Sequence, residues 1–161
     1  MNNVNQRYYF DANALLKYYQ DEDGSLNIRR LISNTTTPIL ISPLTSLECL
    51  AVVMKSYRQG IFKRKMVNSI VYRLRRDKYS ENEKKKRLFQ LVAIPEDTFS
   101  LAENILFQNA LTFNIGSNDA LHLAIVSKLQ LQLSPVLVTS DNSMQKVCER
   151  LSIPFYDPEN E

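Results

Sequence analysis

Short apolar runs alternate along the chain with longer segments in which apolar residues recur at helical spacing. The short runs, bounded by turn-forming residues, predict strands over 8–10, 39–42, 91–94, 135–140 and 154–156. The helical spacing predicts helices over 12–19, 25–33, 45–54, 67–74, 95–113, 118–131 and 143–151. The polar stretch 77–86 is either a loop or the exposed start of the next helix.

Strands separated by helices along the whole chain predict βαβ units. We therefore expect an α/β fold in three layers, α/β/α, with a central, mainly parallel sheet of four to five strands. The nearly continuous apolar run 135–140 is typical of a parallel strand that is covered on both faces. A length of 161 residues with 44% hydrophobic composition predicts one domain over 1–161.

Four acidic residues occupy positions that such a fold can bring together. Asp11 and Asp141 directly follow predicted strands. Asp119 lies in the first turn of one predicted helix, and Glu48 lies about one turn into another. Because the carboxyl ends of parallel strands line one crevice, all four can converge there.

Each acid alone has an ordinary explanation as a helix cap, a partner of a helix dipole or a surface residue. Asp11 and Glu48 fit that explanation least, because apolar neighbours flank both and burial of an unpaired carboxylate is costly. Carboxylates packed together raise one another's pKa, so a cation is the simplest group that lets them ionise.

The remaining composition narrows the chemistry. Oxygen ligands favour Mg²⁺ or Mn²⁺ over zinc, because the chain has a single histidine and two distant cysteines, Cys49 and Cys148, which we interpret as reduced and buried. Two such ions about 4 Å apart could activate water and stabilise the leaving oxygen of a phosphodiester. His122, one turn beyond Asp119, is interpreted as a structural histidine rather than a base.

Charge is distributed unevenly. The net charge is +3, but residues 55–87 hold 13 of the 20 Lys and Arg against three acids, a net +10, which leaves −7 for the rest. This segment, the basic arm, is either a solvated helical face or a contact surface for a polyanion. Its candidate RNA-binding residues are Lys63, Arg64, Lys65, Arg73, Arg75 and Arg76, with Tyr57, Tyr72 and Tyr79 interleaved as stacking platforms for unpaired bases.

Four blocks of the sequence, taken together and in order, resemble the PIN-domain family. The blocks are 9–16 (YFDANALL), 41–48 (ISPLTSLE), 118–124 (NDALHLA) and 137–141 (LVTSD). Within that family, the four blocks are most similar to those of the VapC-type toxins of toxin–antitoxin pairs. The sequence departs from these toxins in one respect, because the basic arm is long and unusually basic for a minimal toxin.

The resemblance implies a metal-dependent endoribonuclease inhibited by a small antitoxin protein, and a homodimer. It assigns metal ligation and catalysis to Asp11, Glu48, Asp119 and Asp141, with polar support from Asn13 and Thr139. Asn13 has an equal alternative as a solvent-facing residue, and Thr139 as an ordinary strand residue. The basic arm has an alternative as the docking site of an acidic partner.

Three functions remain open: an endoribonuclease, a PIN nuclease for DNA or RNA processing, and a binding module without catalysis. The complete acid set argues against the third. A haloacid-dehalogenase-type phosphatase is excluded, because Asn13 stands where that family needs a second Asp. Metal-assisted hydrolysis does not itself distinguish RNA from DNA. We expect a cytoplasmic protein, because neither a signal peptide nor a membrane span is readable.

Overall fold

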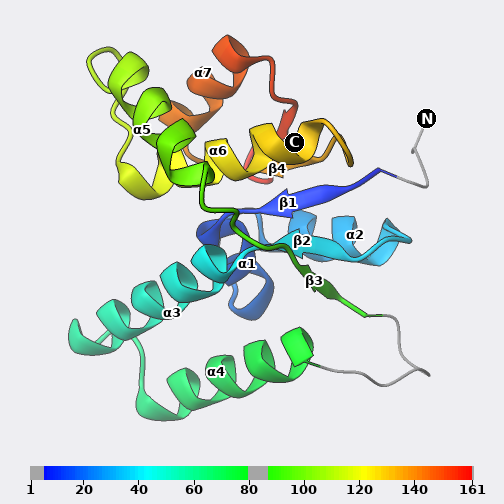
Figure 1. The fold of residues 1–161 in the computed structure, drawn as a ribbon. Coiled ribbons are helices and arrows are strands. Elements are labelled where there is room, and N and C mark those ends of the chain that lie inside the picture. The colour runs from blue at the N-terminus through cyan, green and yellow to red at the C-terminus, as the bar shows by residue number, and fades with distance from the viewer. Residues whose placement is uncertain (1–5, 80–86, 161) are drawn as a thin grey trace.

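The computed structural model describes residues 6–79 and 87–160, in which helices and strands alternate (Figure 1). The elements are β1 (Tyr8–Phe10), α1 (Ala12–Tyr19), α2 (Ser25–Asn34), β2 (Ile39–Ile41), α3 (Pro43–Arg58), α4 (Arg64–Tyr79), β3 (Phe89–Leu91), α5 (Thr98–Asn109), α6 (Ser117–Gln130), β4 (Val136–Val138), α7 (Asn142–Leu151) and β5 (Phe155–Tyr156).

The five strands form one parallel sheet in the order β3-β2-β1-β4-β5. Helices α1 to α4 lie on one side of this sheet and α5 to α7 on the other, as Figure 1 shows. The expected three-layer α/β/α fold with a parallel sheet is therefore confirmed. From β1 the chain adds β2 and β3 on one side, and then crosses to the other side of β1 to add β4 and β5. The strand order therefore reverses between β1 and β4. Ligands of open α/β sheets bind at this point.

Alternation along the short strands divides the core between the two faces. Phe10, Ile39, Ile41 and Val138 pack with α1 to α4 in one buried cluster. On the other face, Tyr9, Leu40 and Leu137 pack with residues of α5, α6 and α7. The helices are thus anchored to a buried sheet, and the residues that follow β1 and β4 have fixed positions.

Several predicted boundaries were wrong by a few residues. Helix α3 begins at Pro43 rather than at 45, because the Ser42 side chain accepts the Thr45 N–H as a cap and Pro43 suits the first helical position. Strand β3 lies at 89–91 rather than 91–94, since Phe89 is the buried residue that pairs with Ile39. Helix α5 is shorter than predicted, and α6 begins at Ser117 rather than at 118.

Helices α3 and α4, of 16 residues each, project together beyond the sheet (Figure 1). The turn between them contains Gly60, whose φ of +73° suits glycine and strains other residues. The predicted polar stretch 77–86 falls partly on the end of α4, while residues 80–86 lie outside the described residues. Within the described ranges, no helix is long and apolar enough to cross a membrane.

Candidate active site

The four predicted acids lie around one pocket of about 280 Å³ at the carboxyl ends of β1 and β4. Asp11 follows β1 directly, and Asp141 comes three residues after β4. Glu48 projects from the second turn of α3, and Asp119 from the first turn of α6. The other lining residues are Ala12, Asn13, Ala51, Val52, Asn118, His122 and Met144. Four separate elements therefore supply one carboxylate each to the same cavity.

The three aspartates owe their positions to helix capping. Asp11 Oδ1 accepts the Ala14 N–H at 2.7 Å, and Asp141 Oδ1 accepts the Met144 N–H at 2.7 Å. Asp119 Oδ2 accepts the Gly116 N–H, also at 2.7 Å. The ordinary explanation as caps and the convergence on one pocket are thus both true. Capping orients each carboxylate with one oxygen, and the other oxygen can serve a ligand.

Burial makes this cluster electrostatically unfavourable without a counter-charge. Asp11 is 4% exposed, and desolvation raises its pKa although the Ala14 N–H opposes this. Desolvation also raises the pKa of Asp119, and the charges of Asp141 and Glu48 add to that rise. Two of the four carboxyls are therefore held above their ordinary pKa, as expected for groups that ionise fully only beside a cation.

Glu48 differs from the aspartates because two side chains of α6 hold it. Asn118 Nδ2 donates to Glu48 Oε1 at 2.6 Å, and His122 Nε2 lies 2.6 Å from Glu48 Oε2. Partial burial raises the pKa of Glu48, but the hydrogen bonds from His122 and Asn118 bring it below its ordinary value. Glu48 is therefore favoured as a carboxylate in the folded chain.

The two predicted supporting residues have different surroundings. Asn13 is exposed and lines the pocket beside Asp11. Thr139 is fully buried, and its Oγ1 accepts the Asp141 N–H at 3.1 Å. A side-chain hydrogen bond of Thr139 also lowers the pKa of Asp11. Thr139 thus connects the two aspartates at the strand ends instead of lining the cavity.

Sequence reasoning missed Asn118, Tyr9, Ser42 and Thr45. Asn118 immediately precedes Asp119 in the third motif block, which is the only signal that could have pointed to it. Tyr9 lies inside the first block, but nothing in the sequence indicates that its hydroxyl contacts His122. These contacts join residues far apart in the chain.

The donor set fits a hard divalent cation. It consists of carboxylate and amide oxygens around a polar cavity, the ligands that Mg²⁺ and Mn²⁺ prefer. In residues 6–79 and 87–160, no three His, Cys, Asp or Glu side chains are close enough to form a complete metal-binding group. Each aspartate instead keeps one oxygen on its helix cap, so ligation would draw on the remaining oxygens and on water.

The raised pKa of Asp11 predicts a pH-dependent stability difference. A carboxyl whose pKa is higher in the folded than in the unfolded chain stabilises the fold below its unfolded pKa, near 3.8, and loses that contribution as pH rises through the folded pKa. Asn at this position keeps the cap but cannot ionise. In EDTA, the melting temperature of Asp11→Asn should therefore gain on wild type as pH rises from about 4 to 7. An equal difference at both pH values would contradict this.

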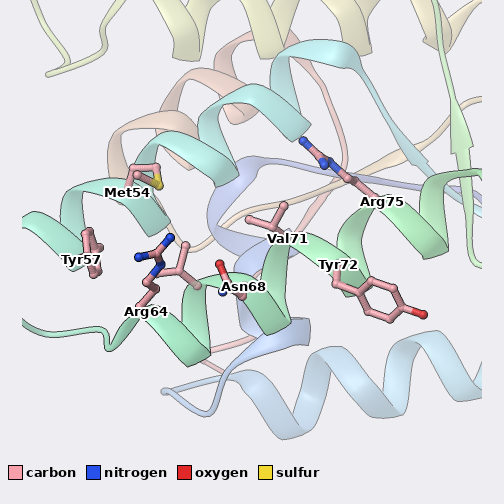
Figure 2. A pocket seen from close by; sticks show the side chains of 8 residues that line it. Met54, Tyr57, Arg64, Asn68, Val71, Tyr72 and Arg75 are labelled. Carbon is pink, nitrogen blue, oxygen red and sulfur yellow. The ribbon is translucent and has the colours of Figure 1, made fainter.

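A second, larger cavity of about 590 Å³ lies between α3 and α4, away from the acids. Figure 2 shows Met54 and Tyr57 of α3 opposite Arg64, Asn68 and Val71 of α4. A neighbouring cavity of about 410 Å³ shares Val71 and Arg75 with it and continues the groove toward β3. We call this surface the α3–α4 groove; it has apolar walls and basic residues at its rim.

The structure separates the six predicted RNA-binding residues. Lys63 and Lys65 are exposed at the start of α4, and Arg64 and Arg75 line the α3–α4 groove. Arg73 and Arg76 have partners within the chain. Arg73 donates to the Tyr19 carbonyl and lies over the Tyr19 ring, and Arg76 pairs with buried Asp77.

The comparisons identify the family. A family model of the PIN domain matches residues 8–150, so the chain belongs to the PIN-domain family. PIN domains are generally nucleases that use divalent metals. A comparison with curated protein sequences found no match.

Solved structures share the fold. The chain is similar to FitAcB from Neisseria gonorrhoeae, with 16% identity, a TM-score of 0.64 and coverage of 96% of this chain and 99% of the other. It is also similar to a toxin–antitoxin complex from Klebsiella pneumoniae (16% identity, TM-score 0.55, coverage 94% and 97%). A third is VapBC2 from Rickettsia felis bound to a promoter DNA fragment (17% identity, TM-score 0.58, coverage 94% and 98%).

Proposed function

We propose that this protein is a metal-dependent endoribonuclease and the toxin of a toxin–antitoxin pair. The observation that carries the proposal is the single pocket to which four elements supply Asp11, Glu48, Asp119 and Asp141. Membership of a family of nucleases and the structural similarity to a toxin–antitoxin complex from Klebsiella pneumoniae support it.

The four carboxylates are proposed to hold Mg²⁺ or Mn²⁺. Asp11 and Asp119 are the central ligands of this proposal, because burial raises the pKa of both and a bound cation would favour their ionised forms. A bound ion supplies a nucleophilic water and stabilises charge on the phosphodiester. Asn13, exposed at the pocket, orients water or a phosphate oxygen there. Thr139 holds Asp11 and Asp141 in position relative to each other through its hydrogen bonds to both.

RNA is the proposed substrate because the basic arm offers exposed cations together with exposed aromatic rings. Tyr57, Tyr72 and Tyr79 are 42%, 67% and 66% exposed, so they offer surface to unpaired bases, and Lys78 Nζ lies 5.0 Å from the centre of the Tyr79 ring. Lys63, on the turn before α4, and Lys65, in its first turn, are also exposed. Stacking and phosphate contacts together are typical of single-strand recognition.

This assignment predicts a change in salt dependence. A Lys63→Ala/Lys65→Ala variant should bind single-stranded RNA more weakly, and the slope of log affinity against log salt should fall by about 1.4, since each lost phosphate contact on a single strand removes about 0.7. The matched control is Arg30→Ala/Lys146→Ala, which removes two exposed cations from α2 and α7. Fluorescence anisotropy with Asp119→Asn protein and labelled RNA measures both slopes. Equal slopes in the two variants would exclude this part of the arm from RNA binding.

The antitoxin is proposed to place an acidic amphipathic segment in the α3–α4 groove. Val67, Val71 and Met54 offer it an apolar surface, and Arg64 and Arg75 offer complementary charge. A segment there would occupy arm residues that RNA also needs, so inhibition would follow from competition. Val71→Asp should then abolish inhibition by an antitoxin without abolishing cleavage.

The function is tested by incubating the protein with single-stranded RNA, structured RNA and single-stranded DNA in Mg²⁺, Mn²⁺ or EDTA. Cleavage of RNA in either metal, its absence in EDTA and its absence with Asp141→Asn would support the proposal. Preferred cleavage of DNA would replace the substrate class. RNA binding without cleavage in any metal would favour a binding module over a nuclease.

A further inference from the structure

A buried histidine links Glu48 to the centre of the sheet. His122 is 2% exposed, and both of its ring nitrogens have partners. Nε2 lies 2.6 Å from Glu48 Oε2, and Nδ1 lies 2.9 Å from the hydroxyl of Tyr9 on β1. The Tyr9 and His122 rings also pack edge to face, with centroids 5.7 Å apart. The imidazole therefore has little freedom to turn.

The chain of hydrogen bonds continues to the start of α3. The Tyr9 hydroxyl lies 2.9 Å from Ser42 Oγ, the cap of that helix, and Thr45 Oγ1 donates to the Phe10 carbonyl at 3.1 Å. Tyr9, Ser42 and Thr45 are all fully buried. These hydrogen bonds connect the end of β1, the first turn of α3 and the middle of α6, and none of the side chains that form them is exposed.

The hydrogens available on each side chain determine which atom donates in each of these hydrogen bonds. An ionised Glu48 only accepts, so His122 Nε2 must carry the hydrogen. In a neutral ring Nδ1 is then the acceptor, and the Tyr9 hydroxyl donates to it. Ser42 Oγ can donate to Tyr9 in turn. The hydrogens of Ser42 Oγ, the Tyr9 hydroxyl and His122 Nε2 then all point toward Glu48, while Thr45 Oγ1 donates to the Phe10 carbonyl.

With these donors in place, both carboxylate oxygens of Glu48 can still accept a ligand. Each carboxylate oxygen has two lone pairs, and the hydrogen bonds from Asn118 and His122 use one on each oxygen. A second lone pair on each oxygen remains for the pocket. A free Glu side chain would lose rotamer freedom on binding a metal. Here Asn118 and His122 have already restricted it.

We propose that His122 is a positioning residue that, braced by Tyr9, holds Glu48 in the orientation needed for divalent-metal binding. The inference rests on the proposed function, since it concerns the metal site of that nuclease. His122 lines the pocket, but Glu48 and Tyr9 occupy both of its ring nitrogens, so it acts through Glu48 and not as a metal ligand. Residues that orient metal ligands commonly change metal affinity by about 10–100-fold when they are replaced.

The test is calorimetric titration of metal-free protein with Mn²⁺, together with melting temperatures in EDTA. His122→Leu should weaken Mn²⁺ binding by about 10–100-fold, because Glu48 keeps only the hydrogen bond from Asn118. His122→Gln, whose amide can still donate to Glu48, should recover most of that affinity. Tyr9→Phe, which removes only the brace, should weaken binding by about twofold to tenfold, the effect of one neutral hydrogen bond.

A control separates positioning from general loss of stability. Val53→Ala creates a cavity at a fully buried position of α3 outside the hydrogen-bonded chain. It should lower the melting temperature while Mn²⁺ affinity stays at the wild-type value. Measurement of RNA cleavage at saturating Mn²⁺ adds a second readout, since His122→Leu should then regain most of its rate.

Three outcomes decide the inference. Weak binding by His122→Leu with recovery by His122→Gln would support it. Wild-type Mn²⁺ affinity in His122→Leu and Tyr9→Phe would overturn it, and metal-dependent cleavage by wild type would leave the proposed function standing. Absence of Mn²⁺ binding by wild type would reject the proposed function and this inference together.

Discussion

Replacing Asp11 with Asn should abolish RNA cleavage without unfolding the protein. The change removes a carboxylate that faces the pocket from the end of β1, and metal stabilisation of the reacting phosphate is worth several kcal/mol. A loss of about 4 kcal/mol corresponds to a decrease in kcat/KM of about 10³-fold. Single-turnover cleavage of labelled RNA at saturating Mg²⁺ measures the decrease.

The same variant should be at least as stable as wild type when no metal is present. Asn caps helices as well as Asp does, so the bond from the Ala14 N–H persists. Asn also avoids the desolvation of a charged carboxylate, which raises the pKa of Asp11. Lost activity with an undiminished melting temperature in EDTA would separate catalysis from folding. Activity within about tenfold of wild type would remove Asp11 from the catalytic set.

Divalent metal should stabilise the wild-type protein strongly. Binding to the folded state alone adds about 4 kcal/mol when the free metal is about 1,000 times its dissociation constant. For a chain of this length, 1 kcal/mol shifts the melting temperature by about 2–4 °C, so the total shift should be about 8–16 °C. The effect is large because the ion relieves repulsion among carboxylates that the fold holds together.

The control for this shift is Asp119→Asn, which should melt at nearly the same temperature with and without Mn²⁺. The neutral amide introduced by this substitution is a poorer metal ligand than the carboxylate, while its oxygen can still accept the Gly116 N–H. Scanning calorimetry at increasing Mn²⁺ measures both proteins. An equal shift in wild type and Asp119→Asn would place the stabilising ion at another site.

Most of the fold could be predicted from local pattern. The bounds of β1 and α1 match the prediction because an apolar run meets a capping residue, Asp11, at that point. The start of α3 was missed because Ser42 was assigned to the preceding strand. In the structure the Ser42 side chain caps the helix. The β3 boundary was missed because an edge strand is only partly buried and its alternation is weak.

The site was predictable only as a set of acids. The acids stand at strand ends and helix starts in the sequence, and the topology of a parallel sheet brings such positions to one end of the sheet. The partners of Glu48 were not predictable, because they depend on distances between α3 and α6 that no local pattern encodes. The sequence favoured a structural role for His122; in the structure both of its ring nitrogens have partners, and one of them is an acid of the site.

The basic arm shows a different limit. Composition identified the excess of positive charge, but not which cations have partners within the chain. Arg76 pairs with Asp77, which is 6% exposed and also accepts a hydrogen bond from Tyr19. A sequence pattern cannot separate such structural cations from Lys63 and Lys65 at the surface.

The most direct test of the central claim is analysis of the ends that cleavage leaves on a labelled RNA, in Mg²⁺ and in EDTA. If the carboxylates hold ions that activate water, cleavage requires the metal and leaves no 2′,3′-cyclic phosphate, because the 2′-hydroxyl is not the nucleophile. Products without cyclic phosphate, formed only with metal, are the predicted result. Cleavage that continues in EDTA, or products ending in 2′,3′-cyclic phosphate, would contradict the account.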